Sequence, residues 1–292
     1  IAPDKYIYNK VCDHTQESSL DINAMLDIVR DAEVVIFAGG ISPRLEGEEM
    51  PVEVPGFRGG DRESIELPQV QRLALKALKE AGKRVVLVNF SGSAVGLVPE
   101  SDNCDAILQA WYPGQAGGQA VAEVLFGDYN PSGRLPVTFY KNVNQLPDFE
   151  DYNMTGRTYR YFKDEPLFPF GYGLSYTTFA YGEMQAPASA KVNKTFKVTI
   201  PVTNQGSIDG DEIVQLYLKK QDDEEGPIKA LRAYKRVHIP AGKTIQVELE
   251  LTPKQLVWWD KETNTMRTQA GTFDIMIGGN SNELTTQPIR IE

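Results

Sequence analysis

With 292 residues, the chain has the length of about two domains, and its 41% of hydrophobic residues is enough for each domain to bury a core. Its net charge of −10 argues against nucleic acid and anionic membrane surfaces as partners, because like charges repel. No apolar run approaches the ~20 residues that cross a bilayer. A neutral ligand such as a sugar is compatible with this composition.

The two cysteines, Cys12 and Cys104, are too few for a disulfide framework, so we expect both to be buried free thiols. The two histidines, His14 and His238, leave little material for a His-rich metal site or a Ser-His-Asp triad. We therefore predict neither a metal nor a cofactor. The chain begins at Ile1 without an apolar signal core, which we interpret as a cut end.

Three short apolar runs stand in the first part of the chain, at 32–38 (AEVVIFA), 84–90 (RVVLVNF) and 106–111 (AILQAW). Continuous runs of this length are typical of parallel strands that are buried on both faces. Helical patterns precede or follow them, at 21–29, 73–82 and 119–126. Strands that alternate with helices predict an α/β domain with a parallel sheet.

Ligands of such domains bind beyond the carboxyl ends of the strands. We therefore expect any site in the loops that leave those ends, at 39–61, 91–98 and 112–118. The first loop is about four times as long as a usual strand-to-helix connection, and such loops are often binding loops or lids.

The pattern changes after residue 126. Residues 127–178 are rich in aromatic residues and interrupted by prolines, so we interpret them as a segment packed on a surface. From about Phe179, apolar and polar residues alternate in short strands, at 196–202, 214–218, 245–251 and 273–277. This spacing predicts an antiparallel sandwich of the immunoglobulin or fibronectin type.

The long first loop carries the candidate catalytic groups. Glu46, Glu48 and Glu49 place three carboxyl groups within four residues, beside Gly47. Glycine allows close approach of a substrate, and partial burial or like-charged neighbours raise a carboxyl pKa toward the range of a general acid. A loop whose acidic side chains are simply solvated is the alternative explanation of this motif.

Several longer motifs resemble glycoside hydrolase family 3, and they occur in the order in which that family has them. They are Glu46-Gly47-Glu48, Gly60-Asp61-Arg62, Leu67-Pro68-x-x-Gln71, 111–118 (WYPGQAGG), 127–136 (GDYNPSGRLP), 168–177 (FPFGYGLSYT), 214–217, 231–237 and 271–273. The resemblance spans residues 20–292. It implies a three-layer α/β sandwich with a mainly parallel sheet, followed by a fibronectin type III-like β-sandwich. We place the α/β domain at 1–155, an aromatic linker at 156–178 and the β-sandwich at 179–292.

Members of this family remove terminal β-linked sugars from non-reducing ends with retention of configuration. The resemblance implies a β-glucosidase or β-xylosidase of which this chain supplies the last two domains, while the aspartate nucleophile belongs to a missing N-terminal barrel. On its own the chain is then expected to be inactive. The family motif places the acid/base at Glu48. Because Glu49 stands where the family usually has a glycine, Glu46 and Glu49 remain alternatives.

Three more residues are candidate sugar contacts. Trp111 and Tyr112 lie at the carboxyl end of the third predicted strand, where aromatic rings either pack in the core or stack on a sugar. Arg62 either forms a loop-bracing ion pair with Asp61 or contacts the sugar. A non-catalytic carbohydrate-binding protein derived from such an enzyme is the alternative function. The resemblance also implies a β-linked oligosaccharide and the barrel as partners, and a secreted or periplasmic location.

Overall fold

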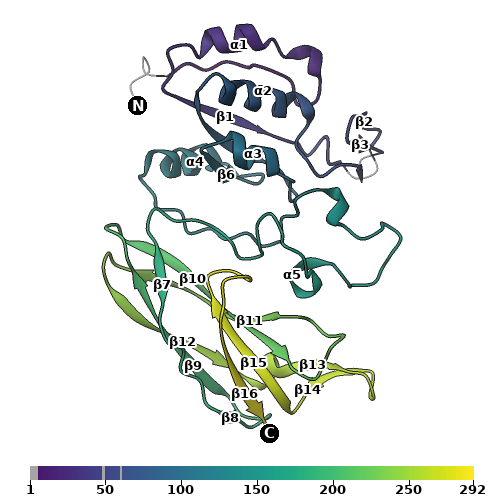
Figure 1. The fold of residues 1–292 in the computed structure, drawn as a ribbon, viewed down its shortest axis with the longest axis vertical. Helices are drawn as coiled ribbons and strands as arrows, with labels where there is room; N and C mark the ends of the chain where they lie inside the picture. Colours follow the sequence, from purple (N-terminus) through teal and green to yellow (C-terminus); the bar gives the residue numbers. More distant parts are fainter. Residues whose placement is uncertain (1–5, 48–49, 60) are drawn as a thin grey trace. The chain divides into compact units, whose positions relative to one another are not determined.

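A computed structural model describes residues 6–47, 50–59 and 61–292. The chain splits into two compact units, Ile1–Val121 with Phe139–Leu146, and Ala122–Thr138 with Pro147–Glu292. Both units are drawn in Figure 1. None of the helices in the described residues is long and apolar enough to cross a membrane.

The first unit is built on a parallel sheet with the strand order β1 (Val34–Gly40), β5 (Arg84–Phe90), β6 (Ala106–Gln109). Its helical elements are η2 (Glu17–Ser19), α1 (Ile22–Ile28), α2 (Gln69–Glu80), α3 (Val98–Asn103), α4 (Gly117–Phe126), which runs on into the second unit, and η3 (Val143–Gln145). Helix α2 packs against β1 and β5, and α3 packs against α2 and β6 (Figure 1). The predicted parallel sheet is confirmed, whereas the three-layer arrangement stays a prediction.

Strand β1 runs two residues further than its apolar run, because Gly39 and Gly40 continue the ladder with Asn89 and Phe90. Gly40 has a φ of 127°, and a β-carbon there would lie 2.0 Å from the Phe90 carbonyl oxygen. Only glycine can occupy this position without displacing β5.

The second unit is a β-sandwich. Its elements are α5 (Thr158–Tyr161), β7 (Phe179–Tyr181), β8 (Ser189–Ala190), β9 (Phe196–Asn204), β10 (Gly210–Lys220), β11 (Ala230–Ile239), β12 (Thr244–Leu251), η4 (Pro253–Leu256), β13 (Val257–Asp260), β14 (Thr265–Thr268), β15 (Gly271–Gly278) and β16 (Thr285–Ile291). One sheet has the order β11-β10-β15-β16-β8 and the other β12-β9-β7. Alternate residues of both sheets, such as Val198, Leu216 and Ile275, bury a common apolar core.

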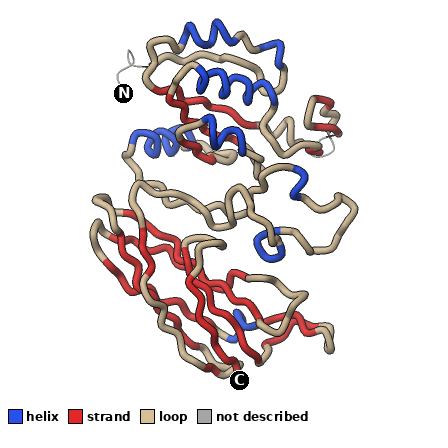
Figure 2. Tube along the Cα trace, in the orientation of Figure 1, coloured by secondary structure: helices blue, strands red, loops and turns tan. Residues whose placement is uncertain are grey.

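The aromatic segment before the sandwich is mostly loop, drawn in tan in Figure 2. Two of its motifs pair with each other: the Leu135 amide donates to the Tyr172 carbonyl (2.8 Å), and the Gly171 amide donates to the Leu135 carbonyl (2.8 Å). The side-chain amide of Gln215 in β10 donates to the Gly171 carbonyl (3.2 Å). A β-carbon on Gly171 would lie 2.1 Å from the side-chain oxygen of Gln215. These parts of the segment therefore pack on the sandwich, whereas Phe139–Leu146 belongs to the first unit and the rings of Phe149 and Tyr152 are exposed.

A buried ion pair fastens the same segment to β10. Arg134 and Glu212 are 9% and 4% exposed, and their Nη2 and Oε2 atoms are 2.6 Å apart. The Tyr181 hydroxyl donates to the other carboxylate oxygen of Glu212 (2.8 Å). Burial and this carboxylate raise the pKa of Tyr181, which keeps the hydroxyl protonated as a donor.

Both cysteines are free, as predicted, but Cys12 is only half-buried where a buried thiol was expected. Cys104 is buried, and burial raises the pKa of its thiol to about 12. A thiol in this environment stays protonated and packs as a small apolar side chain.

Candidate active site

The carboxylate of Glu46 joins the loops that follow all three strands of the parallel sheet. Glu46 lies in the loop after β1, and one of its oxygens accepts the amide of Gly92 (3.0 Å), which follows β5. The Ser93 hydroxyl donates to Glu46 as well, and so does the hydroxyl of Tyr112, which follows β6. The predicted meeting of loops at this edge of the sheet is therefore present, with Glu46 at its centre.

Arg62 braces the loop after β5. Its Nη1 donates to the Ser93 hydroxyl (2.9 Å) and to the Ala94 carbonyl (3.0 Å), and its Nε donates to the Ser64 carbonyl (3.1 Å). Burial lowers the pKa of Arg62, and the charge of Glu46 opposes this shift. Arg62 thus contacts the β5 loop and its own segment, and within the described ranges no ion pair with Asp61 is found. Its buried Nη2 has no partner among the described residues.

Trp111 and Tyr112 are adjacent in the sequence but face different surroundings. Trp111 packs edge-to-face on Phe139, with ring centroids 6.0 Å apart, and has a φ of 56°. A positive φ is costly for a bulky residue, so the packing around Trp111 must hold it. Burial and the hydrogen bond to Glu46 raise the pKa of Tyr112, so its hydroxyl remains a donor.

A polar network underlies the β5 loop. Asn89 donates to the side-chain oxygen of Gln109 (2.6 Å), Gln109 donates to the Ser91 hydroxyl (2.9 Å), and Ser91 donates to the Ser93 carbonyl (2.8 Å). Sequence reasoning missed this network, although Asn89 and Gln109 are polar residues inside otherwise apolar runs. The network fixes the backbone that presents Ser93 to Glu46.

Gln71 fixes the start of the long loop. The side chain of this residue, which is buried in the first turn of α2, pairs with both backbone groups of Gly40: it donates to the carbonyl (2.6 Å) and accepts the amide (2.7 Å). This double contact gives a structural reason for the glutamine of the Leu67-Pro68-x-x-Gln71 motif.

Within the long loop the chain forms a small meander, which the sequence did not predict. Its strands are β2 (Glu53–Val54), β3 (Phe57–Arg58) and β4 (Asp61–Arg62). Phe57 is 3% exposed, and the guanidinium of Arg62 lies 5.9 Å from its ring centroid. Glu48, the predicted acid/base, and its rival Glu49 lie outside the described residues, between Glu46 and this meander.

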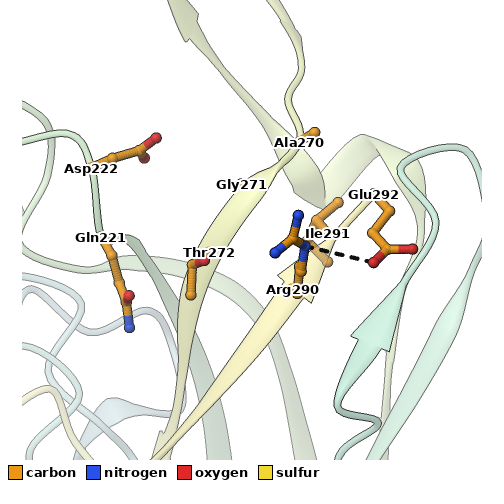
Figure 3. Close-up of a pocket in the computed structure, with 8 residues that line it drawn as sticks. All are labelled: Gln221, Asp222, Ala270, Gly271, Thr272, Arg290, Ile291 and Glu292. Carbon is orange, nitrogen blue, oxygen red and sulfur yellow. Dashed lines mark ion pairs between the residues drawn. The ribbon is translucent and has the colours of Figure 1, made fainter.

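The second unit offers no comparable site in its described hollows. The larger one, of about 610 Å³, is lined by the residues labelled in Figure 3, which include Asp222, Arg290 and Glu292 but no aromatic ring. Trp258 is 3% and Trp259 49% exposed, so the two do not form an exposed pair for stacking on a sugar. Among the described residues, no three Asp, Glu, His or Cys side chains are grouped so that they could hold a metal ion.

Comparisons with known proteins identify the family. Residues 5–176 match the model of the glycosyl hydrolase family 3 C-terminal domain, and residues 212–281 match that of the fibronectin type III-like domain. The chain belongs to glycoside hydrolase family 3, as its motifs imply.

Curated relatives and solved structures agree with this assignment. The chain is 58% identical, over 92% of its length, to a xylan 1,4-beta-xylosidase of Xylanibacter ruminicola, and 34% identical, over 89%, to a periplasmic beta-glucosidase of Salmonella typhimurium. A β-glucosidase structure from Erythrobacter marinus superposes with a TM-score of 0.81 at 35% identity, covering 93% of this chain and 36% of that one. The chain spans 31% and 34% of the two curated relatives, or about a third of their length.

Proposed function

We propose that this chain is the acid/base-bearing C-terminal part of a retaining β-xylosidase or β-glucosidase that removes terminal sugars from β-linked oligosaccharides. The nucleophile would lie in an N-terminal barrel outside this sequence. The xylosidase name of the 58% identical relative makes xylo-oligosaccharides the first substrates to test. The name of the Salmonella relative supports an exported enzyme.

The hydrogen bonds of Glu46 are the observation on which we assign the catalytic and the positioning glutamate. Both oxygens of Glu46 are occupied by hydrogen bonds from groups of its own chain, whereas a general acid/base must exchange a proton with the substrate. We therefore assign Glu46 to positioning the loop and keep Glu48, two residues later, as the acid/base with Glu49 as its rival. The three hydrogen bonds of Glu46 support this proposal because they hold the chain immediately before Glu48 and Glu49.

In the proposed reaction Glu48 protonates the leaving glycosidic oxygen while the aspartate attacks the anomeric carbon. Glu48 then removes a proton from the water that hydrolyses the glycosyl-enzyme. Retention requires the two carboxyl groups to be about 5–5.5 Å apart, so the long loop must reach the nucleophile. This chain alone is expected to be inactive.

The test uses the longer natural chain with single substitutions Glu46→Gln, Glu48→Gln and Glu49→Gln. Loss of a general acid/base slows hydrolysis by about 10²–10⁴-fold. We expect Glu48→Gln alone to show this loss on xylobiose, and to recover turnover of an activated aryl β-xyloside when azide is added. The product would be the β-xylosyl azide, because azide needs no general base.

Recovery by azide in Glu49→Gln or Glu46→Gln in place of Glu48→Gln would transfer the acid/base role to that residue. Full activity of all three variants would refute a catalytic role for this loop. Hydrolysis by the 292-residue chain alone would refute a nucleophile in the missing barrel.

A further inference from the structure

Two arginines of the second unit lie together at the edge of its larger sheet. Arg232 belongs to β11, the edge strand, and is the extra residue of a β-bulge: Leu216 pairs with Ala233 and Tyr217 with Leu231, so Arg232 has no partner on β10. Bulges redirect a side chain out of the regular alternation of a strand.

The bulge places the Arg232 guanidinium over the ring of Trp258, 4.4 Å from its centroid. Trp258 is 3% exposed and belongs to the sandwich core. Arg232 is therefore held against a fixed platform by a cation–π contact, and its side chain is half-buried.

Helix α5 brings the second arginine to the same place. The Arg160 carbonyl accepts the amide of Ile228 (2.8 Å), and the Tyr159 hydroxyl accepts the amide of Leu231 (3.1 Å), so α5 is fastened to the start of β11. Arg160 is close enough that its charge adds to burial in lowering the pKa of Arg232. Thr158, the first residue of α5, has a φ of 56°, a strained conformation that the surrounding contacts must maintain.

These two cations lack an acceptor. In the part of the chain that the structure describes, the buried Nε atoms of Arg160 and Arg232 have no hydrogen-bond partner, and neither has the indole Nε1 of Trp258. No ion pair within the described ranges joins either arginine to a carboxylate, whereas the half-buried Arg72 and the buried Arg134 each have one. Leaving buried donors and neighbouring like charges unpaired costs free energy, so the cluster is suited to an anion.

We propose that Arg160 and Arg232 form a binding site for a carboxylate. The planar guanidinium presents parallel N–H groups that match the two oxygens of a carboxylate, and two such groups can share one anion. Two sources of the carboxylate fit the chemistry. One is a uronate unit of an acidic oligosaccharide, which rests on the proposed glycosidase function, and the other is a small free carboxylate.

The test measures binding to the 292-residue chain and does not depend on hydrolysis. The chain has three tryptophans, so ¹⁵N-labelled indole groups give three resonances, of which that of Trp258 reports on the site. We expect saturable shifts of this resonance with sodium D-glucuronate and none with D-glucose, which has the same ring but no charge. Binding of D-glucuronate about tenfold tighter than acetate would identify an acidic sugar, and equal binding would identify the carboxylate alone.

Substitutions connect the signal to the two arginines. Arg160→Gln and Arg232→Gln should each weaken binding by about tenfold or more, because each removes charge-assisted hydrogen bonds. Arg232→Lys keeps the positive charge but lacks the planar guanidinium. Its affinity for the carboxylate should therefore lie between that of the two glutamine variants and that of the parent. Arg236→Gln is the matched control, because Arg236 lies on the same strand, is exposed and already pairs with Asp211 (2.7 Å). Thermal melting verifies that each variant is folded.

The proposal is overturned if carboxylates at about 50 mM, well above a millimolar dissociation constant, leave the Trp258 resonance unchanged. It is also overturned if both Arg160→Gln and Arg232→Gln, in folded form, bind as well as the parent. Failure of the glycosidase proposal would show in the hydrolysis assay and leave this binding result intact.

Discussion

At Glu46, two carboxylate oxygens receive hydrogen bonds from groups that lie 46, 47 and 66 residues further along the chain. A carboxylate is the one side-chain group that can accept all three without offering a donor in return. An amide in its place keeps one acceptor oxygen and turns an N–H₂ group toward at least one existing donor.

We therefore expect Glu46→Gln to lower the free energy of unfolding by about 1–3 kcal/mol, because it leaves a donor unpaired. Tyr112→Phe removes only one donor and should cost about 1 kcal/mol. In the double variant the two effects should be less than additive, since both act on one contact. Urea denaturation of the four proteins measures this cycle, and strict additivity would show that Glu46 and Tyr112 are not coupled.

The sequence predicted the edge of the sheet at which these loops meet, but not the hydrogen bonds of Glu46, and the position of Glu48 stays a prediction. The position of Tyr112 and the β5 loop at one edge follows from the rule that parallel strands end together. The bonds of Glu46 depend instead on three loop conformations set by distant residues such as Gln71 and Asn89. No local pattern in the sequence contains that information.

Helix α3 carries a buried carboxyl group, that of Glu100, whose oxygens accept no hydrogen bond among the described residues. Glu100 is fully buried and forms an ion pair with Arg72 of α2, 3.4 Å away. Burial raises the pKa of Glu100 above its ordinary value of 4.5, and Arg72 opposes the shift only in part.

This shift predicts a pH dependence of stability. Above pH 4.5 the unfolded chain has lost the Glu100 proton while the folded chain still holds it, so stability falls as the pH rises toward the raised pKa. Glu100→Gln does not titrate. The stability of the parent relative to this variant should therefore decline across the window, by at most about 1.4 kcal/mol per pH unit.

Urea midpoints of both proteins from about pH 4 to pH 8, which spans the ordinary carboxyl range and beyond, test this prediction. Glu80→Gln, which removes an exposed carboxyl group from α2, provides the control. If the free energy of unfolding of the parent, relative to that of Glu100→Gln, rises with pH, the assigned direction of the pKa shift is wrong.

The regular elements were predictable to different degrees. The run RVVLVNF gave the bounds of β5 because a central strand of a parallel sheet is apolar on both faces. Helix α3 escaped prediction because its sequence, VPESDN, is short and polar, and its place depends on the contact of Glu100 with Arg72. The meander β2–β4 escaped because two-residue strands leave no periodicity to detect.

At the scale of the whole molecule, the division into units does not follow a single cut in the sequence. The first unit includes Phe139–Leu146, and the second includes Ala122–Thr138. A sequence pattern reports where the periodicity changes, at about Phe179, and not which loop packs on which sheet. The predicted borders at 155/156 and 178/179 stay a prediction that truncation can test.

The ion pair between Arg134 and Glu212 predicts the result of such a truncation. A sandwich that begins at residue 179 lacks Arg134, and removing one partner of a buried ion pair costs about 3–5 kcal/mol. We therefore expect the fragment 179–292 to melt well below the fragment 127–292.

The same argument predicts opposite effects of Glu212→Gln in the two fragments. The substitution should destabilise 127–292, where Arg134 loses its anion, and stabilise 179–292, where the carboxylate has no cation. Circular dichroism melts of the four proteins compare these signs. If Glu212→Gln shifts both fragments in the same direction, the residues before 179 do not neutralise Glu212, and the sandwich is independent of them.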